Sequence, residues 1–173
     1  MAYSPVAIAN YFISRAAREG APLSHMKLQK LVYFAEGWHL AFKDQQLIDD
    51  RIEAWPYGPV IKSLYHQFKS YRNANIREPE TIIEANGGRI KVDIPNIPNG
   101  DTFTLGLLNK IWEIYGNFSA IDLSTMTHQD GTPWHKTYKE RGGGGSQAEE
   151  IPRALIGDYF KALRQGNLAK SHG

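Results

Sequence analysis

The sequence predicts a mostly α-helical domain of the α+β class, a compact bundle of about six helices with a small β-hairpin or sheet. Along most of the chain, apolar residues recur at spacings of three and four, which is the period of a helix buried on one face. Serine and proline residues stand where these stretches begin, and glycines stand where they end. Strand-like alternation is confined to a few short segments. We expect residues 1–166 to form one domain and residues 167–173 to be a flexible tail.

The first helix is expected over residues 5–18. Ser4 is a good helix cap and Pro5 suits the first helical position. Apolar residues then recur on one face, and Gly20 is a natural stop. The chain therefore begins with a helix that buries one side.

The second helix is expected to be the central one. Its cap is Ser24, it runs to about Lys43, and its apolar stripe is unusually broad. The residues of the stripe are Leu28, Leu31, Val32, Phe34, Ala35, Trp38, Ala41 and Phe42. Outside the stripe, we expect Lys27, Lys30 and Glu36 to remain solvated.

A short strand and a turn separate the second helix from the third. Residues 44–51 form a polar loop, and residues 52–55 alternate like a short strand. The Pro-Tyr-Gly-Pro segment at 56–59 predicts a turn, because glycine permits unusual dihedral angles and proline fixes its own. Pro59 is then expected to open the third helix. The apolar face of that helix consists of Ile61, Leu64, Tyr65 and Phe68.

A small hairpin and a fourth helix follow. Residues 82–84 and 89–92 alternate like strands, and they flank an Asn-Gly-Gly turn at 86–88. The next helix has a clear apolar face and ends at Gly116. The face consists of Leu108, Ile111, Trp112 and Tyr115.

The C-terminal quarter predicts two further helices. Ser119 and Asp122 have the spacing of a capping box, so a short helix is expected to end near His128. Residues 130–133 predict a turn that leads into a Trp-His pair, and the glycine-rich stretch at 142–146 is expected to be flexible. The last helix is expected to open at Pro152. Its apolar face consists of Leu155, Ile156, Tyr159, Phe160 and Leu163.

Composition restricts the compartment and the kind of partner. The chain has 173 residues and 20 Lys and Arg against 18 Asp and Glu, so its formal charge of +2 argues against bulk DNA or an anionic membrane as the main partner. Cysteine is absent, which excludes disulfides and thiolate chemistry and suits a reducing cytoplasm. The amino terminus does not resemble a signal peptide, and no apolar run approaches the roughly 20 residues that span a bilayer. We expect a cytoplasmic protein.

No residue pattern predicts catalysis, a cofactor or a metal. No two histidines are four residues apart, and the zinc motif H-E-x-x-H and the nucleophile motif G-x-S-x-G are both missing. Asp49, Asp50 and Glu53 could together hold Mg²⁺, but a solvated loop that runs into a strand is the favoured interpretation. His39 is expected to be a hydrogen-bonded residue at the edge of the core. A hydrolase is the least favoured class.

Protein binding is better supported. Trp55 and Tyr57 lie in a segment stiffened by two prolines, and rigid aromatic residues lose little entropy on binding. An equally open alternative is that Trp55 and Tyr57 plug the core, which is the favoured role for Trp134. Two helices joined by a turn, followed by the hairpin, could make a winged helix-turn-helix, with a row of basic residues formed by Lys62, Lys69 and Arg72. This row is sparse for a DNA reader, so an ordinary solvated helix face is favoured and DNA binding is expected to be weak.

Five segments resemble the Panacea domain family, which includes SocA-like antitoxins and phage-associated GepA-like proteins. They are KLQKLVYFAEGWHL at 27–40, IEAWPYGPV at 52–60, Tyr-His at 65–66, GTPW at 131–134 and Ile-Pro at 151–152. The resemblance implies an antitoxin that neutralises a co-encoded protein toxin by direct contact. In the SocA-like branch it also implies an adaptor that delivers a SocB-like toxin to the ClpXP protease. The family implies no catalytic residues.

These lines combine into one expectation about the contact surface. We expect a toxin to bind the aromatic turn and the helix after it, and no cofactor or metal to take part. The candidate partner-binding residues are Trp55, Tyr57, Gly58, Pro59, Lys62, Tyr65 and His66. The alternative function is a DNA-binding repressor with a winged-helix-like element, which could coexist with toxin binding.

Overall fold

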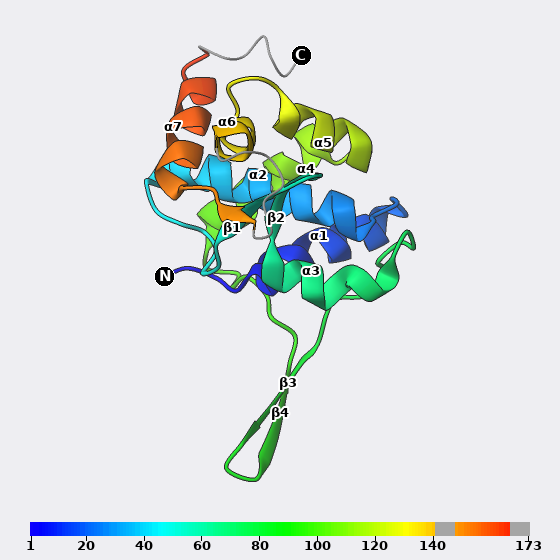
Figure 1. Cartoon of the computed structure of the whole chain (residues 1–173). Coiled ribbons are helices and arrows are strands. Elements are labelled where there is room, and N and C mark those ends of the chain that lie inside the picture. Colours follow the sequence, from blue (N-terminus) through cyan, green and yellow to red (C-terminus); the bar gives the residue numbers. More distant parts are fainter. Residues whose placement is uncertain (141–147, 167–173) are drawn as a thin grey trace.

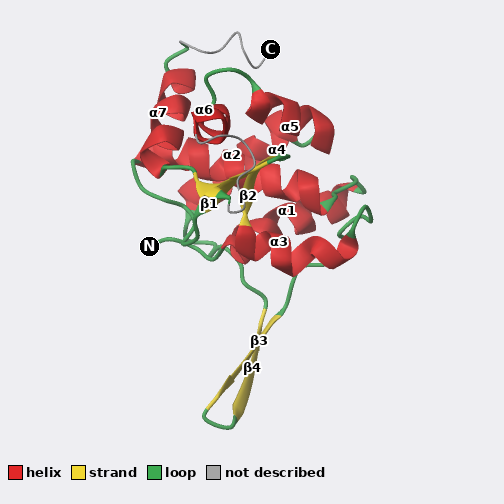
Figure 2. Ribbon diagram, viewed as in Figure 1, coloured by secondary structure: helices red, strands yellow, loops and turns green. Residues whose placement is uncertain are grey.

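A helical body and one projecting hairpin make up the computed structural model (Figures 1 and 2). It describes residues 1–140 and 148–166, which contain seven α-helices, one 3-10 helix and five strands. The helices are α1 (Pro5–Glu19), α2 (His25–Lys43), α3 (Lys62–Phe68), η1 (Lys69–Tyr71), α4 (Thr102–Tyr115), α5 (Ala120–His128), α6 (Pro133–Glu140) and α7 (Arg153–Arg164). The strands are β1 (Ile52–Trp55), β2 (Gly58–Ile61), β3 (Ile82–Asn86), β4 (Arg89–Asp93) and β5 (Glu149–Glu150). The predicted fold class is confirmed, with one helix more than expected.

Local capping signals set the ends of the first two helices, as predicted. The Ser4 hydroxyl accepts the Ala7 N–H at 3.3 Å, and Gly20 ends α1 in the left-handed region at φ 63°. The Ser24 hydroxyl accepts the Lys27 N–H at 3.2 Å at the start of α2. Helix α2 is the centre of the body, because α1, α4, α5, α7 and β2 all pack against it.

The expectation that the charged residues of α2 are solvated is wrong. Lys27, Lys30 and Glu36 are all buried, and Lys30 and Glu36 are 1% and 0% exposed. The reason is tertiary: neighbouring elements cover α2 on its polar side as well as on its apolar side. Each buried charge therefore has a fixed polar partner, described for Lys30 and Glu36 below.

A three-stranded sheet in the order β2-β1-β5 lies against α2 and α6. Strands β1 and β2 are antiparallel, from Ile52 opposite Ile61 to Trp55 opposite Gly58. Pro59 lies inside β2, so the expectation that it opens the third helix is wrong. The Gln29 side chain explains this difference, because it accepts the Ile61 N–H at 2.9 Å and donates to the Ile61 carbonyl at 3.0 Å. These bonds hold the chain extended up to the first residue of α3.

The predicted hairpin forms and projects from the body (Figure 1). Strands β3 and β4 pair from Ile82 opposite Asp93 to Asn86 opposite Arg89. Gly87 and Gly88 form the turn at φ 57° and 78°, a region that side chains with a Cβ rarely adopt.

The C-terminal half contains the one helix that the sequence did not predict. Helix α4 ends before Gly116 and α5 begins with the Ser119–Asp122 capping box, both as expected. Residues 133–140, however, continue beyond the predicted turn as helix α6. Helix α7 follows Pro152 and packs on α2. The stretch at 142–146 and the tail at 167–173, both expected to be flexible, fall outside the described residues.

Aromatic side chains form the centre of the core. Phe34 of α2 stacks on Tyr115 of α4 with ring centroids 4.2 Å apart, and Phe160 of α7 meets Phe34 edge-on at 6.1 Å. Gly37 lets α7 approach α2, since an added Cβ would lie 2.3 Å from the Phe160 ring. None of the described helices is long and apolar enough to cross a membrane.

Candidate partner-binding surface

The turn between β1 and β2, made by Pro56 and Tyr57, depends on the glycine that follows it. Gly58 has φ 110°, which lies in the region that disfavours side chains. A Cβ at this position would also lie 2.9 Å from Lys30 Cε and 2.9 Å from Thr127 Oγ1. The close approach of the backbone to both α2 and α5 therefore requires glycine here.

Side chains from α5 and α6 contact three consecutive carbonyls of this turn. Trp134 Nε1 donates to the Trp55 carbonyl at 2.7 Å, and the Ser124 hydroxyl donates to the Tyr57 carbonyl at 3.0 Å. Between them, His128 Nε2 lies 3.1 Å from the Pro56 carbonyl oxygen. The His128 and Trp134 rings pack together with centroids 3.9 Å apart. Hydrogen bonds from Trp134 and Ser124 thus hold the backbone of the turn at Trp55 and Tyr57, which fixes where its side chains leave the main chain.

The predicted partner-binding residues divide into a buried group and a surface group. Gly58 and Pro59 are buried, which suits a role in shaping the turn. Tyr57 is 72% exposed. Lys62 and His66 are exposed on α3.

Trp55 and Tyr65 lie together on the other part of this surface. Their rings are 4.8 Å apart, and both side chains are half-buried. Trp55 Nε1 donates to Glu53 Oε2 at 2.7 Å, which orients the indole along the strand. Trp134, by contrast, is buried in the core at 5% exposure, as the sequence predicted.

Tyr57 borders a pocket of about 510 Å³ between α5, the start of α2 and the segment after η1. We call it the Tyr57 pocket. Its lining comprises Ser24, Met26, Tyr57, Arg72, Asn73, Ala120, Ile121, Ser124, Thr125 and His128. Arg72 is the one formally charged residue among these described lining residues, and none of them is a carboxylate. Arg72 also has φ 52° and ψ −115°, a strained conformation for a residue with a side chain, and such strain is often found at functional sites.

A buried lysine lies behind the turn. Burial lowers the pKa of Lys30 to about 8, and its ammonium donates to the Pro59 carbonyl at 3.3 Å. His25, whose ring meets Tyr65 at 6.2 Å, also has a lowered pKa, because of its burial and then because of the nearby Lys30 charge. At neutral pH Lys30 therefore places a positive charge on the inner side of the surface, while the lowered pKa of His25 favours its neutral ring.

The sequence missed the residues that hold the turn in place. Ser124 and His128 are one helical turn apart on α5, so their spacing shows that they share a face. It does not show that this face meets residues 56 and 57, which lie about seventy positions earlier. Arg72 was predicted as part of a basic row, and its place in the Tyr57 pocket depends on the loop that follows η1.

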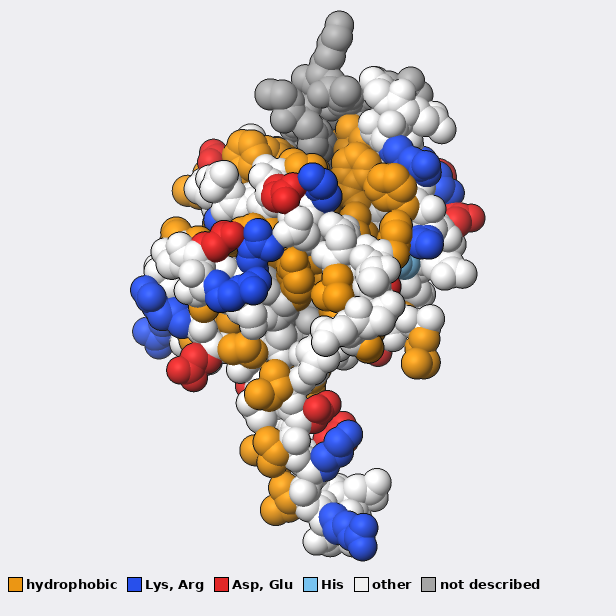
Figure 3. All heavy atoms as spheres, turned by 180° about the vertical axis from the view of Figure 1, so that it is seen from behind, with side chains coloured by type: hydrophobic (Ala, Val, Ile, Leu, Met, Phe, Trp, Pro, Cys, Tyr) orange, Lys and Arg blue, Asp and Glu red, His pale blue; other side chains and the backbone are white. Residues whose placement is uncertain are grey.

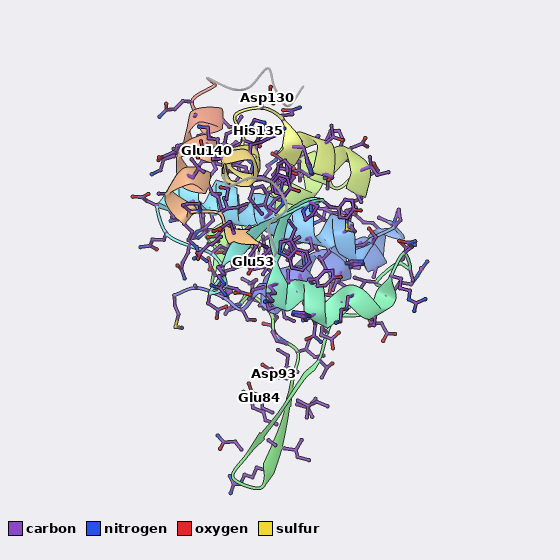
Figure 4. All side chains as sticks on the ribbon, in the orientation of Figure 1. Glu53, Glu84, Asp93, Asp130, His135 and Glu140 are labelled. Carbon is purple, nitrogen blue, oxygen red and sulfur yellow. The ribbon has the colours of Figure 1, made fainter. Side chains whose placement is uncertain are left out.

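The described side chains do not form a cluster of His, Asp and Glu that could hold a metal ion. Figure 4 shows why for the labelled residues: Glu84 and Asp93 lie out on the hairpin, while Asp130 and His135 lie at the opposite end of the molecule. Asp130 and His135 are paired at 3.2 Å. Of the three carboxylates weighed for Mg²⁺, Glu53 is buried and is already bound to Trp55. His39 is nearly buried, with Nδ1 2.7 Å from the Gln45 carbonyl, in the role predicted for it.

Residues 28–135 match the model of the family described as Antitoxin SocA-like, Panacea domain. The chain belongs to this family. A Panacea relative, Antitoxin SocA of Caulobacter vibrioides, is 32% identical over 134 residues, which cover 74% of this chain and 66% of that protein. The match thus spans just under two thirds of the relative's length. No solved structure matches the chain.

The Panacea match contains nearly the whole surface described above. It begins in α2 and ends in α6, so it includes the β1–β2 turn together with Ser124, His128 and Trp134. Two of the segments that resemble the family, at 52–60 and 131–134, meet at the bond between Trp134 and the Trp55 carbonyl. The Panacea resemblance therefore includes both sides of the contact that fixes the turn.

Proposed function

We propose that this protein is an antitoxin that neutralises a co-encoded protein toxin by direct binding in the cytoplasm. Membership of the SocA-like Panacea family and the likeness to an antitoxin support the class of function. The observation that carries the mode of action is Tyr57, an exposed aromatic ring on a turn whose Trp55 and Tyr57 carbonyls accept hydrogen bonds from Trp134 and Ser124. A tyrosine on a backbone that is already fixed has only its two side-chain torsions to order when a partner covers it. The proposal includes no catalytic step, cofactor or metal.

The Tyr57 pocket is the proposed centre of the contact. Ile121, exposed on α5, and the Tyr57 ring supply apolar surface, and Arg72 supplies a positive charge. A toxin side chain that combines an apolar stem with a carboxylate would match this lining. Trp55, Lys62, Tyr65 and His66 extend the contact along α3. Gly58 and Pro59 contribute by shaping the turn.

A test of this surface is the substitution Tyr57→Ala. An anchor of this kind typically contributes about 2 kcal/mol or more, so we expect the affinity for the toxin to fall about thirtyfold or more. The melting temperature should change little, because the ring is exposed. Isothermal titration with the product of the neighbouring gene and a thermal melt would measure the two effects. Tyr57→Phe is the matched control, since it retains the ring and should retain most of the affinity.

Two outcomes would contradict different parts of the proposal. If Tyr57→Ala binds the toxin as well as the wild type does, the surface is wrong and the antitoxin role remains. If the wild-type protein forms no complex with its neighbour's product on size-exclusion chromatography and gives no rescue from toxicity, the antitoxin role itself is wrong.

Delivery of the bound toxin to the ClpXP protease is a further part of the proposal. It rests on the resemblance to SocA-like adaptors. Purified ClpXP should degrade the toxin faster when this protein is present, and Tyr57→Ala should remove that acceleration. A toxin that stays intact with ClpXP and the wild-type protein would limit the role to sequestration.

A further inference from the structure

A second hollow lies on a different part of the body, between α2 and α4. It has a volume of about 460 Å³, and we call it the α2–α4 groove. Its lining comprises Trp38, Phe42, Thr102, Phe103, Gly106, Leu107, Lys110, Ile111 and Ile114. None of these residues lines the Tyr57 pocket. Seen from behind, the body carries a gathering of hydrophobic side chains with Lys and Arg beside it (Figure 3).

Helix α4 has an apolar face that the body leaves uncovered. Its inner face packs into the core through Leu108, Ile111 and Trp112. A second row borders the groove, in which Phe103 and Ile114 are exposed and Leu107 between them is buried. A helix that is apolar on more than one side is normally covered on each of them. The second row therefore indicates a contact that the described chain does not itself make.

Gly106 lines the groove and has no side chain to extend into it. An added Cβ at this position would have no atom within 4 Å, so the fold does not require glycine here. Glycine in a helix interior costs roughly 0.5–1 kcal/mol relative to alanine. The residue that destabilises α4 is thus the one that leaves space for an occupant.

The rim of the groove is positively charged. Lys43 Nζ lies 4.2 Å from the centre of the Phe103 ring, and the Arg164 guanidinium lies 4.5 Å from the centre of the Phe42 ring. Neither cation makes an ion pair with another described residue. Of the nearby carboxylates, Glu113 pairs with Lys110 and Asp44 pairs with Lys161, both exposed pairs. Asp101, which borders a neighbouring hollow together with Lys43, accepts a hydrogen bond from the Tyr3 hydroxyl at 2.7 Å. Lys43 and Arg164 therefore lie over aromatic rings of the groove without an ion-pair partner among the described residues, and Arg164 Nη1 donates to the Ala41 carbonyl at 3.1 Å.

We propose that the α2–α4 groove binds an amphipathic helix of a partner protein, with carboxylates beside its apolar stripe. The lining offers almost no polar groups, so an occupant must satisfy its own backbone hydrogen bonds, which a helix does and an isolated extended strand does not. The charge of the rim selects acidic flanks, which would meet Lys43 and Arg164. This site is separate from the proposed toxin contact and can be occupied at the same time.

Synthetic peptides provide the probe. One peptide of roughly 16 residues, about four helical turns, has leucines at helical spacing and glutamates on both sides of the stripe. A second has lysines in place of the glutamates. We expect the acidic peptide to bind about tenfold more tightly at low salt, with the difference shrinking as salt is added. Fluorescence anisotropy of labelled peptide would give both affinities.

Methyl resonances locate the binding. With isoleucine methyl groups labelled for NMR, the acidic peptide should shift Ile111 and Ile114 and leave Ile121 of the Tyr57 pocket unchanged. Gly106→Leu should abolish the binding, because it fills the groove, while the protein stays folded with equal or greater helix stability. Ile121→Ala is the control variant outside the groove and should bind the acidic peptide normally.

Charge reversal tests the choice of partner. In the double variant Lys43→Glu with Arg164→Glu, the lysine peptide should become the tighter ligand. Failure of the wild-type protein to bind the acidic peptide would overturn the proposal, as would normal binding by Gly106→Leu. Equal affinity for the two peptides would overturn the claim that the partner is acidic. All of these results are independent of whether a toxin binds at Tyr57.

Discussion

Helix α2 buries charged side chains, whereas the β3–β4 hairpin exposes apolar ones. Helix α2 places Lys30 and Glu36 in the interior of the body. The hairpin leaves Ile83, Ile90 and Val92 in water, with Ile83 69% exposed. The two regions differ in what surrounds them, since six elements (α1, α3, α4, α5, α7 and β2) pack on α2 while the hairpin projects from the body (Figure 1).

The buried charges of α2 hold distant segments in place. Glu36 Oε2 accepts the N–H groups of Leu47 and Ile48 at 2.8 and 3.0 Å, and its other oxygen accepts from Arg153 of α7 at 2.9 Å. Lys30 reaches the Pro59 carbonyl in β2. Each charge thus joins α2 to a loop, strand or helix that lies far from it in the sequence.

The hairpin has one apolar and one polar face. On one face Ile83 lies opposite Val92, and Ala85 lies opposite Ile90. The other face pairs Glu84 with Lys91 and Asn86 with Arg89. Two-stranded hairpins are at best marginally stable alone in water. The comparison shows that a sequence pattern identifies which residues share a face, while the tertiary neighbours decide whether that face is covered.

The largest effect is expected at the centre of α2. Glu36→Gln keeps the volume of the side chain and removes its charge. Arg153 then has no ion-pair partner, and one of the two side-chain oxygens that accept N–H groups is lost. Breaking a buried pair of this kind costs about 3–5 kcal/mol, so the free energy of unfolding should fall by that amount. Urea denaturation would measure it. Glu113→Gln is the control, since it breaks an exposed pair with Lys110 and should cost less than about 1 kcal/mol. Equal losses would show that the interior of α2 is hydrated in solution.

A smaller, pH-dependent effect is expected at Lys30. Burial lowers its pKa to about 8, while the unfolded chain retains a value near 10.4. Between these values the unfolded state holds a proton that the folded state lacks, so stability rises with pH, by up to about 1.4 kcal/mol per unit. Below pH 8 both states are protonated and the burial of the charge opposes folding in full.

The substitution Lys30→Met removes this dependence. At pH 7 the variant should be as stable as the wild type or more stable, because a well-packed apolar side chain replaces a buried charge. As the pH rises from 8 to 10, the wild type should gain on the variant. The difference between their urea midpoints is the quantity to measure, since shifts at Lys27 and other groups are common to both proteins. A difference independent of pH would mean that Lys30 is not desolvated.

Features encoded within a few residues were predictable, and features that join distant segments were not. The caps at Ser4, Ser24 and Ser119 depend on bonds that span three residues, and all three were predicted. The contact of Ser124 with the Tyr57 carbonyl spans 67 positions and has no local signal. For the same reason the sequence placed Tyr57 among candidate binding residues but could not distinguish an anchor from a core plug. Its exposure of 72% excludes the core plug, and its role as an anchor stays a prediction.

The smallest effect is expected on the apolar face of the hairpin. Ile83→Thr keeps a β-branched side chain and removes apolar surface that is already in water, so the free energy of unfolding should change by no more than about 0.5 kcal/mol. Ile61→Thr is the matched control, because it makes the same change in β2 at a fully buried position and should cost roughly 1–3 kcal/mol. Urea denaturation of both variants at two protein concentrations gives the answer. A large loss for Ile83→Thr that grows with concentration would show that the hairpin is covered by another copy of the chain in solution, and the contrast with α2 would then disappear.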